Sequence, residues 1–163
     1  MRDCINSFIK ECCAYAILQG QEFIPKIHQV GTLTSDTNQR ATKVFAGENI
    51  NLKGFYIIME YIDTISLTKC WISQNECLNI QAKKALKSIH DYGISHGGIT
   101  HENFLIKNSD KYKDNLKVYF IDFGCCKFSK LQTQFPNICT NKKSFNNSKK
   151  RDEANINQYF IDL

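Results

Sequence analysis

The sequence predicts a chain of the α+β class that folds as one domain over residues 1–163. Three observations lead to this prediction. Apolar residues recur at helical spacing in several stretches, β-branched and aromatic residues gather in short runs typical of strands, and turn-forming residues separate these segments. A chain of 163 residues can bury one hydrophobic core but has no room for two full domains.

The composition is that of a folded protein. An apolar content of 42% with 12% aromatic residues argues against a disordered chain. The net charge of +5 is modest, and solubility alone explains it. Much of this charge lies in one basic segment, which we interpret as a solvated loop, with a nucleic-acid surface as the alternative. The segment contains Lys142, Lys143, Lys149, Lys150 and Arg151.

The chain contains eight cysteines, which include two adjacent pairs but no C-x-x-C motif. This spacing supports neither a zinc ribbon nor a thioredoxin motif. No stretch has the apolar length of a signal peptide core or a membrane span. We therefore expect a reducing cytosolic or nuclear location, no membrane contact, and cysteines that pack as small core hydrophobes. For Cys125 a redox-sensitive thiol is the alternative to a packed side chain.

A first helix is predicted from Ile5 to a stop at Gly20, because apolar residues follow helical spacing there. Its apolar stripe consists of Ile5, Phe8, Ile9, Cys12 and Ala16, and an adjoining face carries Glu11, Tyr15 and Leu18. A strand entered through Pro25 is predicted from Ile24 to Leu33, followed by a polar loop over Thr34–Lys53. A buried strand then runs over Gly54–Ile62 into a connector.

A short helical piece with Trp71 as core packing is predicted over Leu67–Ser73, and a longer helix from about Asn75 to His90. The longer helix places an apolar stripe on one side and lysines on the other. The stripe consists of Leu78, Ala82, Ala85, Leu86 and Ile89, and the lysines are Lys83, Lys84 and Lys87. The last predicted helix lies within Arg151–Leu163 and uses Ile156, Tyr159, Phe160 and Leu163.

Two further strands are predicted over Phe104–Ile106 and Leu116–Ile121, joined by a hairpin loop of turn formers. Asn103 enters the first strand and Asp122 leaves the second. An amide oxygen and a carboxylate that converge from neighbouring strands form a site for Mg²⁺ carrying nucleotide phosphates. The alternative is that Asn103 is an ordinary turn residue and Asp122 a helix or turn cap.

The stretch from His96 to Gly124 resembles the protein-kinase superfamily. His96, Gly97, Asn103 and the Asp-Phe-Gly of residues 122–124 fall in register with its catalytic loop and metal-binding motif. The His-Gly start is closest in style to small atypical Ser/Thr kinases, such as the one in the KEOPS tRNA-modification complex, and to short fungal kinase-like proteins. The Phe-Gly after Asp122 and the helix ending Ile-His-x-x-Gly-Ile favour this branch over kinases of small molecules.

The resemblance implies a two-lobed fold with a reduced N-lobe over residues 1–60 and a shortened helical C-lobe over 61–163. We expect the first strands and the glycine-rich loop of the family to be absent from this chain. Cys125–Lys150 then corresponds to the activation segment. Within it we interpret Ser144 and Ser148 as spacers in a polar loop.

The resemblance also implies roles for individual residues. Asn103 and Asp122 would hold Mg²⁺, and Met59 would be the gatekeeper beside ATP. The backbone of Glu60 and Ile62 would hydrogen-bond the adenine edge. Glu11 would pair with the phosphate-binding lysine of the family, for which the chain has no position upstream of the first helix. His96 would brace the catalytic loop and is not proposed as a base.

One departure from the family affects catalysis directly. Gly98 stands where the family has its catalytic Asp, and glycine has no side chain to accept the proton of a substrate hydroxyl. Such assistance contributes roughly 10²- to 10⁴-fold to the rate. Glu102 is not expected to replace it, because active kinases that have the Asp commonly carry glutamate at this place as well. Thr100 stands where many Ser/Thr kinases have a phosphate-contacting lysine, and small atypical kinases also tolerate threonine there.

Three functions follow as hypotheses. The first is a catalytically impaired, pseudokinase-like domain that retains weak binding of Mg²⁺ and ATP and acts by binding a protein partner. The second is an active Ser/Thr protein kinase whose missing parts lie in a longer product or a second subunit. The third is a non-catalytic scaffold or a basic nucleic-acid-binding module without a nucleotide site.

Overall fold

The computed structural model describes residues 2–33, 54–64, 76–100, 102–108, 116–129, 138 and 140–161. Within these residues, helices and two-stranded antiparallel sheets are mixed, as an α+β chain requires. They divide into two compact units, one formed by Met1–Pro25 and Tyr61–Leu163, the other by Lys26–Glu60. The kinase-like two-lobed arrangement and the division at residue 60 stay predictions. The predicted helical piece around Trp71 lies outside the described residues.

The smaller unit is an antiparallel pair of strands, β1 (Ile27–Leu33) and β2 (Gly54–Met59). The prediction of a strand from Ile24 was wrong at its start. The Ile24 amide donates to the Gln21 carbonyl at 3.0 Å, and Pro25 has no amide hydrogen to offer a neighbouring strand. The second strand is also shorter than predicted, since it ends at Met59.

In the larger unit, α1 (Arg2–Leu18) ends before Gly20, as predicted, and Gly20 adopts a left-handed φ of +87°. The predicted apolar stripe is not the buried face. Ile9 is 41% exposed, whereas Tyr15 and Leu18 of the adjoining face are buried. The burial of that face positions Glu11 beside the segments described below, because residues four apart lie on one side of a helix.

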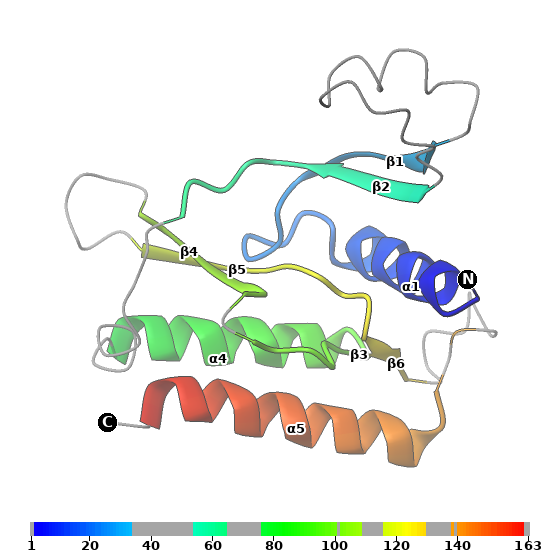
Figure 1. The fold of residues 1–163 in the computed structure, drawn as a ribbon. Coiled ribbons are helices and arrows are strands. Elements are labelled where there is room, and N and C mark those ends of the chain that lie inside the picture. The colour runs from blue at the N-terminus through cyan, green and yellow to red at the C-terminus, as the bar shows by residue number, and fades with distance from the viewer. Residues whose placement is uncertain are drawn as a thin grey trace. The chain divides into compact units, whose positions relative to one another are not determined.

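Strands β4 (Phe104–Asn108) and β5 (Leu116–Phe120) pair antiparallel with Phe104 opposite Phe120, which confirms the predicted hairpin. Beneath them lies α4 (Glu76–Asp91) (Figure 1). The five predicted stripe residues of α4 are buried and its lysines are exposed. A small sheet that the sequence did not predict, β3 (Ile94–Ser95) with β6 (Lys127–Phe128), follows the end of this helix.

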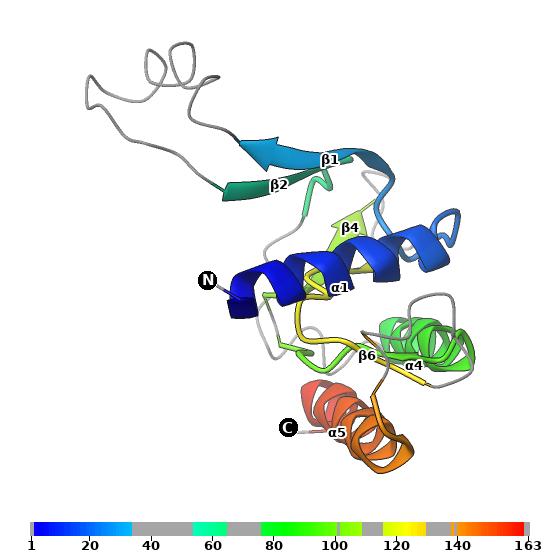
Figure 2. The same ribbon diagram turned by 90° about the vertical axis from the view of Figure 1, so that its right-hand side faces the viewer.

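Helix α5 (Lys142–Ile161) lies beside α4 in both views (Figure 1, Figure 2). It begins well before the predicted Arg151, so the interpretation of the basic segment as a solvated loop was wrong. Asn141 caps the helix, because its Oδ1 accepts the Ser144 amide at 2.8 Å. The buried face includes polar residues and therefore lacks a clear apolar period. It is formed by Phe145, Ser148, Asp152, Ile156 and Phe160.

The cysteines differ in their surroundings. Six of the eight are described, all as free thiols, and Cys13 and Cys126 are buried as predicted. Cys4, Cys77 and Cys125 are exposed, so the prediction of packed cysteines was wrong for these three, whose neighbours leave the thiol in solvent. None of the described helices is long and apolar enough to cross a membrane.

Candidate functional site

The ends of β4 and β5 bring the two predicted metal ligands to neighbouring positions. Asn103 directly precedes β4, and its carbonyl accepts a hydrogen bond from the Ile121 amide at 3.1 Å. Asp122 is the next residue after Ile121. The antiparallel ladder therefore places Asn103 and Asp122 at one end of the hairpin, as their positions in the sequence predicted.

Asp122 has an unusual backbone conformation. Its φ is +61°, and it is the one described residue other than glycine with a positive φ. Such a conformation costs free energy for a residue with a Cβ and is tolerated best by short polar side chains that bond locally. Here the Asp122 Oδ1 accepts the Gly124 amide at 3.2 Å, and the Asp122 amide donates to the Tyr15 hydroxyl at 3.2 Å.

Three aromatic rings form a continuous stack behind Asp122. The ring of Tyr15 on α1 meets the edge of Phe123 at a centroid distance of 5.3 Å. On its other side Phe123 contacts the ring of His96 at 4.6 Å. All three side chains are buried. The stack joins the helix, the Asp-Phe-Gly segment and the loop at Gly97 into one packed body, by apolar burial and favourable ring geometry.

His96 links the loop at Gly97 and Gly98 to the end of β5, as the resemblance implied. Its Nε2 lies 3.0 Å from the Ile121 carbonyl oxygen, and its Nδ1 lies 3.3 Å from the Gly98 amide. Burial lowers the pKa of His96 below its usual range. A neutral ring with the proton on Nε2 satisfies both contacts, since Nε2 then donates and Nδ1 accepts.

Glu11 lies close to Asp122. Burial and the nearby negative charge of Asp122 raise the pKa of Glu11 above its ordinary value of 4.5. Hydrogen bonding from the Tyr15 hydroxyl and the Phe123 backbone amide opposes this and lowers the pKa of its carboxylate. Within the described residues, no lysine or arginine forms an ion pair with Glu11.

A buried carboxylate on α5 anchors the loop from below. Asp152 is fully buried, and its two oxygens accept the backbone amides of His96 at 2.8 Å and of Gly97 at 2.9 Å. His90 Nε2 lies 3.2 Å from the same carboxylate. Sequence reasoning missed Asp152. The signal that could have found it is a lone acidic residue on the apolar face of the last helix, in the i−4 position to Ile156.

Two further side chains of α5, Arg151 and Asn155, bind the same loop. The Arg151 guanidinium donates to the Gly97 carbonyl at 2.6 Å, and the Asn155 amide donates to the Ile99 carbonyl at 3.2 Å. With Asp152, three side chains of one helix therefore satisfy four backbone groups of the loop. This fixes the loop backbone irrespective of what residue 98 carries.

The backbone conformation and the space around a Cβ differ between the two glycines of the loop, Gly97 and Gly98. Gly97 has a φ of +76°, and a Cβ there would collide with the Cys125 carbonyl oxygen. Gly98 has no such φ, and its described neighbours would lie 3.7 Å or more from an added Cβ, which is ordinary van der Waals contact. Position 98 therefore has room for a side chain, and the missing carboxylate is not a steric requirement of the fold.

The remaining predicted residues are distributed over both units. Met59 ends β2. The Glu60 amide donates to the Lys26 carbonyl at 2.8 Å, so of the two backbone groups of Glu60 the carbonyl is the one left for an adenine. Ile62 belongs to the larger unit and is buried. Glu102 and Thr100 are exposed, while His101 lies outside the described residues.

Asn103 and Asp122 suit a Mg²⁺ ion that carries nucleotide phosphates better than a Mg²⁺ ion without them. Among the described residues, no group of three or more His, Cys, Asp or Glu side chains could hold a metal. Asn103 and Asp122 offer two oxygen ligands, and Mg²⁺ usually completes its shell with water and substrate phosphates. The Asn103 amide nitrogen already donates to the Gly98 carbonyl at 2.9 Å, which leaves its oxygen for ligation.

Comparison with known proteins gives a partial match to one curated protein. No protein-family model matches the chain. Among curated proteins, the chain is similar to KEOPS complex subunit Bud32 of Pyrococcus abyssi (strain GE5 / Orsay), with 30% identity over 83 residues. The match covers 48% of this chain but 34% of the relative, so the chain spans about a third of the length of that protein. The similarity supports a kinase-like relationship and nothing finer.

Proposed function

We propose that the chain is a kinase-like domain with impaired catalysis, which binds Mg²⁺ and ATP weakly through Asn103 and Asp122 and acts through a protein partner. One observation carries the proposal. Hydrogen bonds join the loop of His96–Gly98 to the Ile121 carbonyl, directly before the Asp-Phe-Gly segment, and to the Asp152 carboxylate, yet position 98 carries no side chain that could accept a proton.

Support for nucleotide binding comes from Asp122. Its side chain is exposed, its backbone is fixed in the left-handed region, and its Oδ1 bonds the Gly124 amide. A carboxylate held in a conformation that costs free energy is a sign of a functional position. An incoming Mg²⁺ would also offset the repulsion between Asp122 and Glu11.

Support for a partner comes from the relative. Bud32 is named as a subunit of the KEOPS complex, and a domain with little catalytic power acts most directly by association. The exposed apolar side chains of the β1–β2 unit, which include Val30 and Ile58 at 47% and 49% exposure, provide surface for such contact.

The test is a thermal shift of the purified chain with Mg²⁺ and ATP. A ligand at ten times its Kd stabilises the folded state by about 1.4 kcal/mol, which corresponds to a rise in Tm of roughly 3 to 6 °C. Asp122→Ala should abolish the rise. Asp91→Ala, which removes an exposed carboxylate from α4, should retain it. A folded wild-type chain without any rise at millimolar ATP contradicts nucleotide binding.

A substitution at position 98 tests the missing base. Because this position accepts a Cβ without a clash, Gly98→Asp should fold with wild-type stability and gain phosphate transfer, by up to roughly 10²- to 10⁴-fold over the wild type. Gly98→Asn, which has the same shape but no carboxylate, should stay at the wild-type level. Equal gains in both variants would mean that the carboxylate is not what the site lacks.

A second candidate function is an active phosphotransferase that is completed by another polypeptide. Glu11 favours it, since its carboxylate is held by Tyr15 and Phe123 and forms no ion pair with a lysine or arginine of the described chain. A lysine supplied by a partner could occupy this position. The wild type would then transfer phosphate only with the partner present, and Glu11→Gln would remove that activity.

A further inference from the structure

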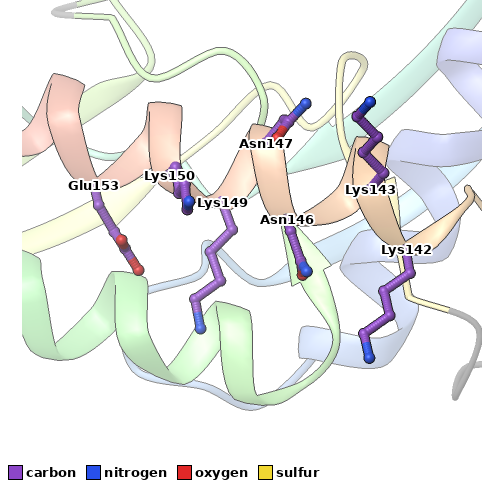
Figure 3. A pocket seen from close by; sticks show the side chains of 7 residues that line it. All are labelled: Lys142, Lys143, Asn146, Asn147, Lys149, Lys150 and Glu153. Carbon is purple, nitrogen blue, oxygen red and sulfur yellow. The ribbon is translucent and has the colours of Figure 1, made fainter.

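A basic surface extends over α5 and the groove between α5 and α4. Its first part is an open hollow of about 650 Å³ on the N-terminal half of α5 (Figure 3). The second part is a groove of about 430 Å³ between the two helices. Lys149 and Glu153 line both, so the two hollows adjoin each other. The surface shares no residue with the candidate nucleotide site.

The charge of this surface is strongly one-sided. Lys87 is paired with Asp91 at 2.6 Å, so these two charges offset each other. The described lining then keeps Glu153 as its remaining carboxylate, 3.8 Å from His90 Nδ1. Against it stand five lysines, namely Lys83, Lys142, Lys143, Lys149 and Lys150. The surface therefore carries an excess of positive charge, in a chain whose net charge is +5.

The lining is polar almost throughout. The first hollow is lined by lysine, asparagine and Glu153, without an apolar or aromatic side chain among its described residues. In the groove, the apolar residues Leu86 and Ile156 are 3% and 2% exposed. An amphipathic peptide or a membrane would need exposed apolar anchors here. Phosphate groups need only cations and hydrogen-bond donors, and lysine and asparagine supply both.

The helix that carries the lysines fixes the spacing of their backbone positions. The opposite face of α5 is buried through Phe145, Asp152 and Phe160. Lys142 to Glu153 therefore span about 16 Å along α5 at a rise of about 1.5 Å per residue. At about 3.4 Å per nucleotide of a helical strand, this length corresponds to roughly five phosphates. In Figure 3, one side of α5 presents Lys142, Asn146, Lys149 and Glu153, and the other presents Lys143 and Asn147.

We propose that this basic surface binds the phosphodiester backbone of a nucleic-acid strand, without sequence preference. Charge complementarity identifies the partner, and the polar lining separates it from a membrane or an apolar peptide. The binding uses neither Asp122 nor Asn103, so it is independent of the proposed nucleotide site.

The experiment measures binding of a fluorescent 12-nucleotide single-stranded RNA of mixed sequence by anisotropy, at several salt concentrations. A triple variant, Lys142→Gln, Lys143→Gln and Lys150→Gln, removes three exposed charges from the surface. The matched control, Lys26→Gln, Lys84→Gln and Lys117→Gln, removes three exposed lysines that do not line it. Asp122→Ala tests independence from the nucleotide site.

The affinity of the wild type should fall steeply as the salt concentration rises. The surface variant should bind at least about tenfold more weakly. Its slope of log affinity against log salt should be shallower by about 2, because each phosphate contact of a single strand contributes about 0.7 to that slope. The control should stay within about threefold, and Asp122→Ala should bind as the wild type does. Equal losses in the two triple variants would overturn the proposal, because net charge alone would then explain binding. So would stronger binding to poly-glutamate or to anionic vesicles than to RNA.

Discussion

The carboxylate of Asp152 on α5 accepts the backbone amide of His96 at 2.8 Å, across 56 residues of sequence. Both residues are fully buried. Through this contact the last described helix fixes the loop that leads into the candidate site. The stability of the domain and the geometry of its site therefore depend on one side chain that touches neither Asn103 nor Asp122.

We expect Asp152→Ala to lower the free energy of unfolding by about 2 to 5 kcal/mol. The change leaves the buried amide of His96 and the partly buried amide of Gly97 without their acceptor, and an unpaired buried group costs about 1 to 3 kcal/mol. Urea unfolding followed by circular dichroism measures the loss. Asp152→Asn retains an acceptor and should lose less. Glu153→Ala changes a half-exposed neighbour and should stay within about 0.5 kcal/mol of the wild type. Equal effects at 152 and 153 would contradict the anchor.

Gly97→Ala and Gly98→Ala should change the free energy of unfolding in opposite directions. At position 97 the left-handed φ and the nearby Cys125 carbonyl predict a loss of at least about 1 to 3 kcal/mol. At position 98 alanine fits and should stabilise by about 0.4 to 1 kcal/mol, since it restricts the unfolded chain. Chemical denaturation of the two variants in parallel checks this, and a destabilised Gly98→Ala would mean that position 98 has no room.

Tyr15→Phe should cost about 1 to 2 kcal/mol. The ring contact with Phe123 at 5.3 Å remains, but the Asp122 amide loses its acceptor and Glu11 loses a donor. Tyr61 is 83% exposed, so Tyr61→Phe is the control and should change the free energy of unfolding by less than about 0.5 kcal/mol. If both variants unfold at the wild-type urea concentration, the hydroxyl does not bridge the two carboxylate-bearing segments.

Glu11→Gln should stabilise the chain at neutral pH. Because burial and Asp122 raise the pKa of Glu11 in the folded state above 4.5, the folded state holds this proton longer than the unfolded state does. The stabilising contribution is present below pH 4.5 and is lost as the pH rises through the raised pKa. Urea unfolding between about pH 4 and pH 8, in EDTA, should show the variant equal to the wild type at the acidic end and more stable at the basic end. If the free energy of unfolding of the wild type instead rises relative to that of the variant as the pH rises, a cation neutralises the charge of Glu11 in the folded state.

Much of the candidate site followed from local sequence. The hairpin of β4 and β5 was predictable because its strands are short apolar runs with turn formers between them, and Asn103 and Asp122 flank the two strands at its open end. The role of His96 as a brace was implied by the resemblance to the kinase superfamily, and the structure shows its contact with the Ile121 carbonyl. The magnesium and ATP assignments stay predictions.

Other features depended on contacts that no local pattern records. The most buried face of α1 was not predicted. Ile9 and Ala16 of the predicted stripe are exposed, whereas Tyr15 and Leu18 of the adjoining face are buried. The short pairing of Ile94–Ser95 with Lys127–Phe128 joins two-residue segments, which are too brief to show a strand period.

The sequence by itself determined the hairpin, the stripe of α4 and the absence of a carboxylate at position 98, since each is a property of residues near one another in the chain. The tertiary structure decided what the basic segment is. The segment is rich in lysine, asparagine and serine, so it was interpreted as a solvated loop. In the fold, the amides of His96 and Gly97 satisfy the Asp152 carboxylate. These hydrogen bonds offset the free energy that burial of the carboxylate costs, and the segment forms a helix with its lysines in an ordered array.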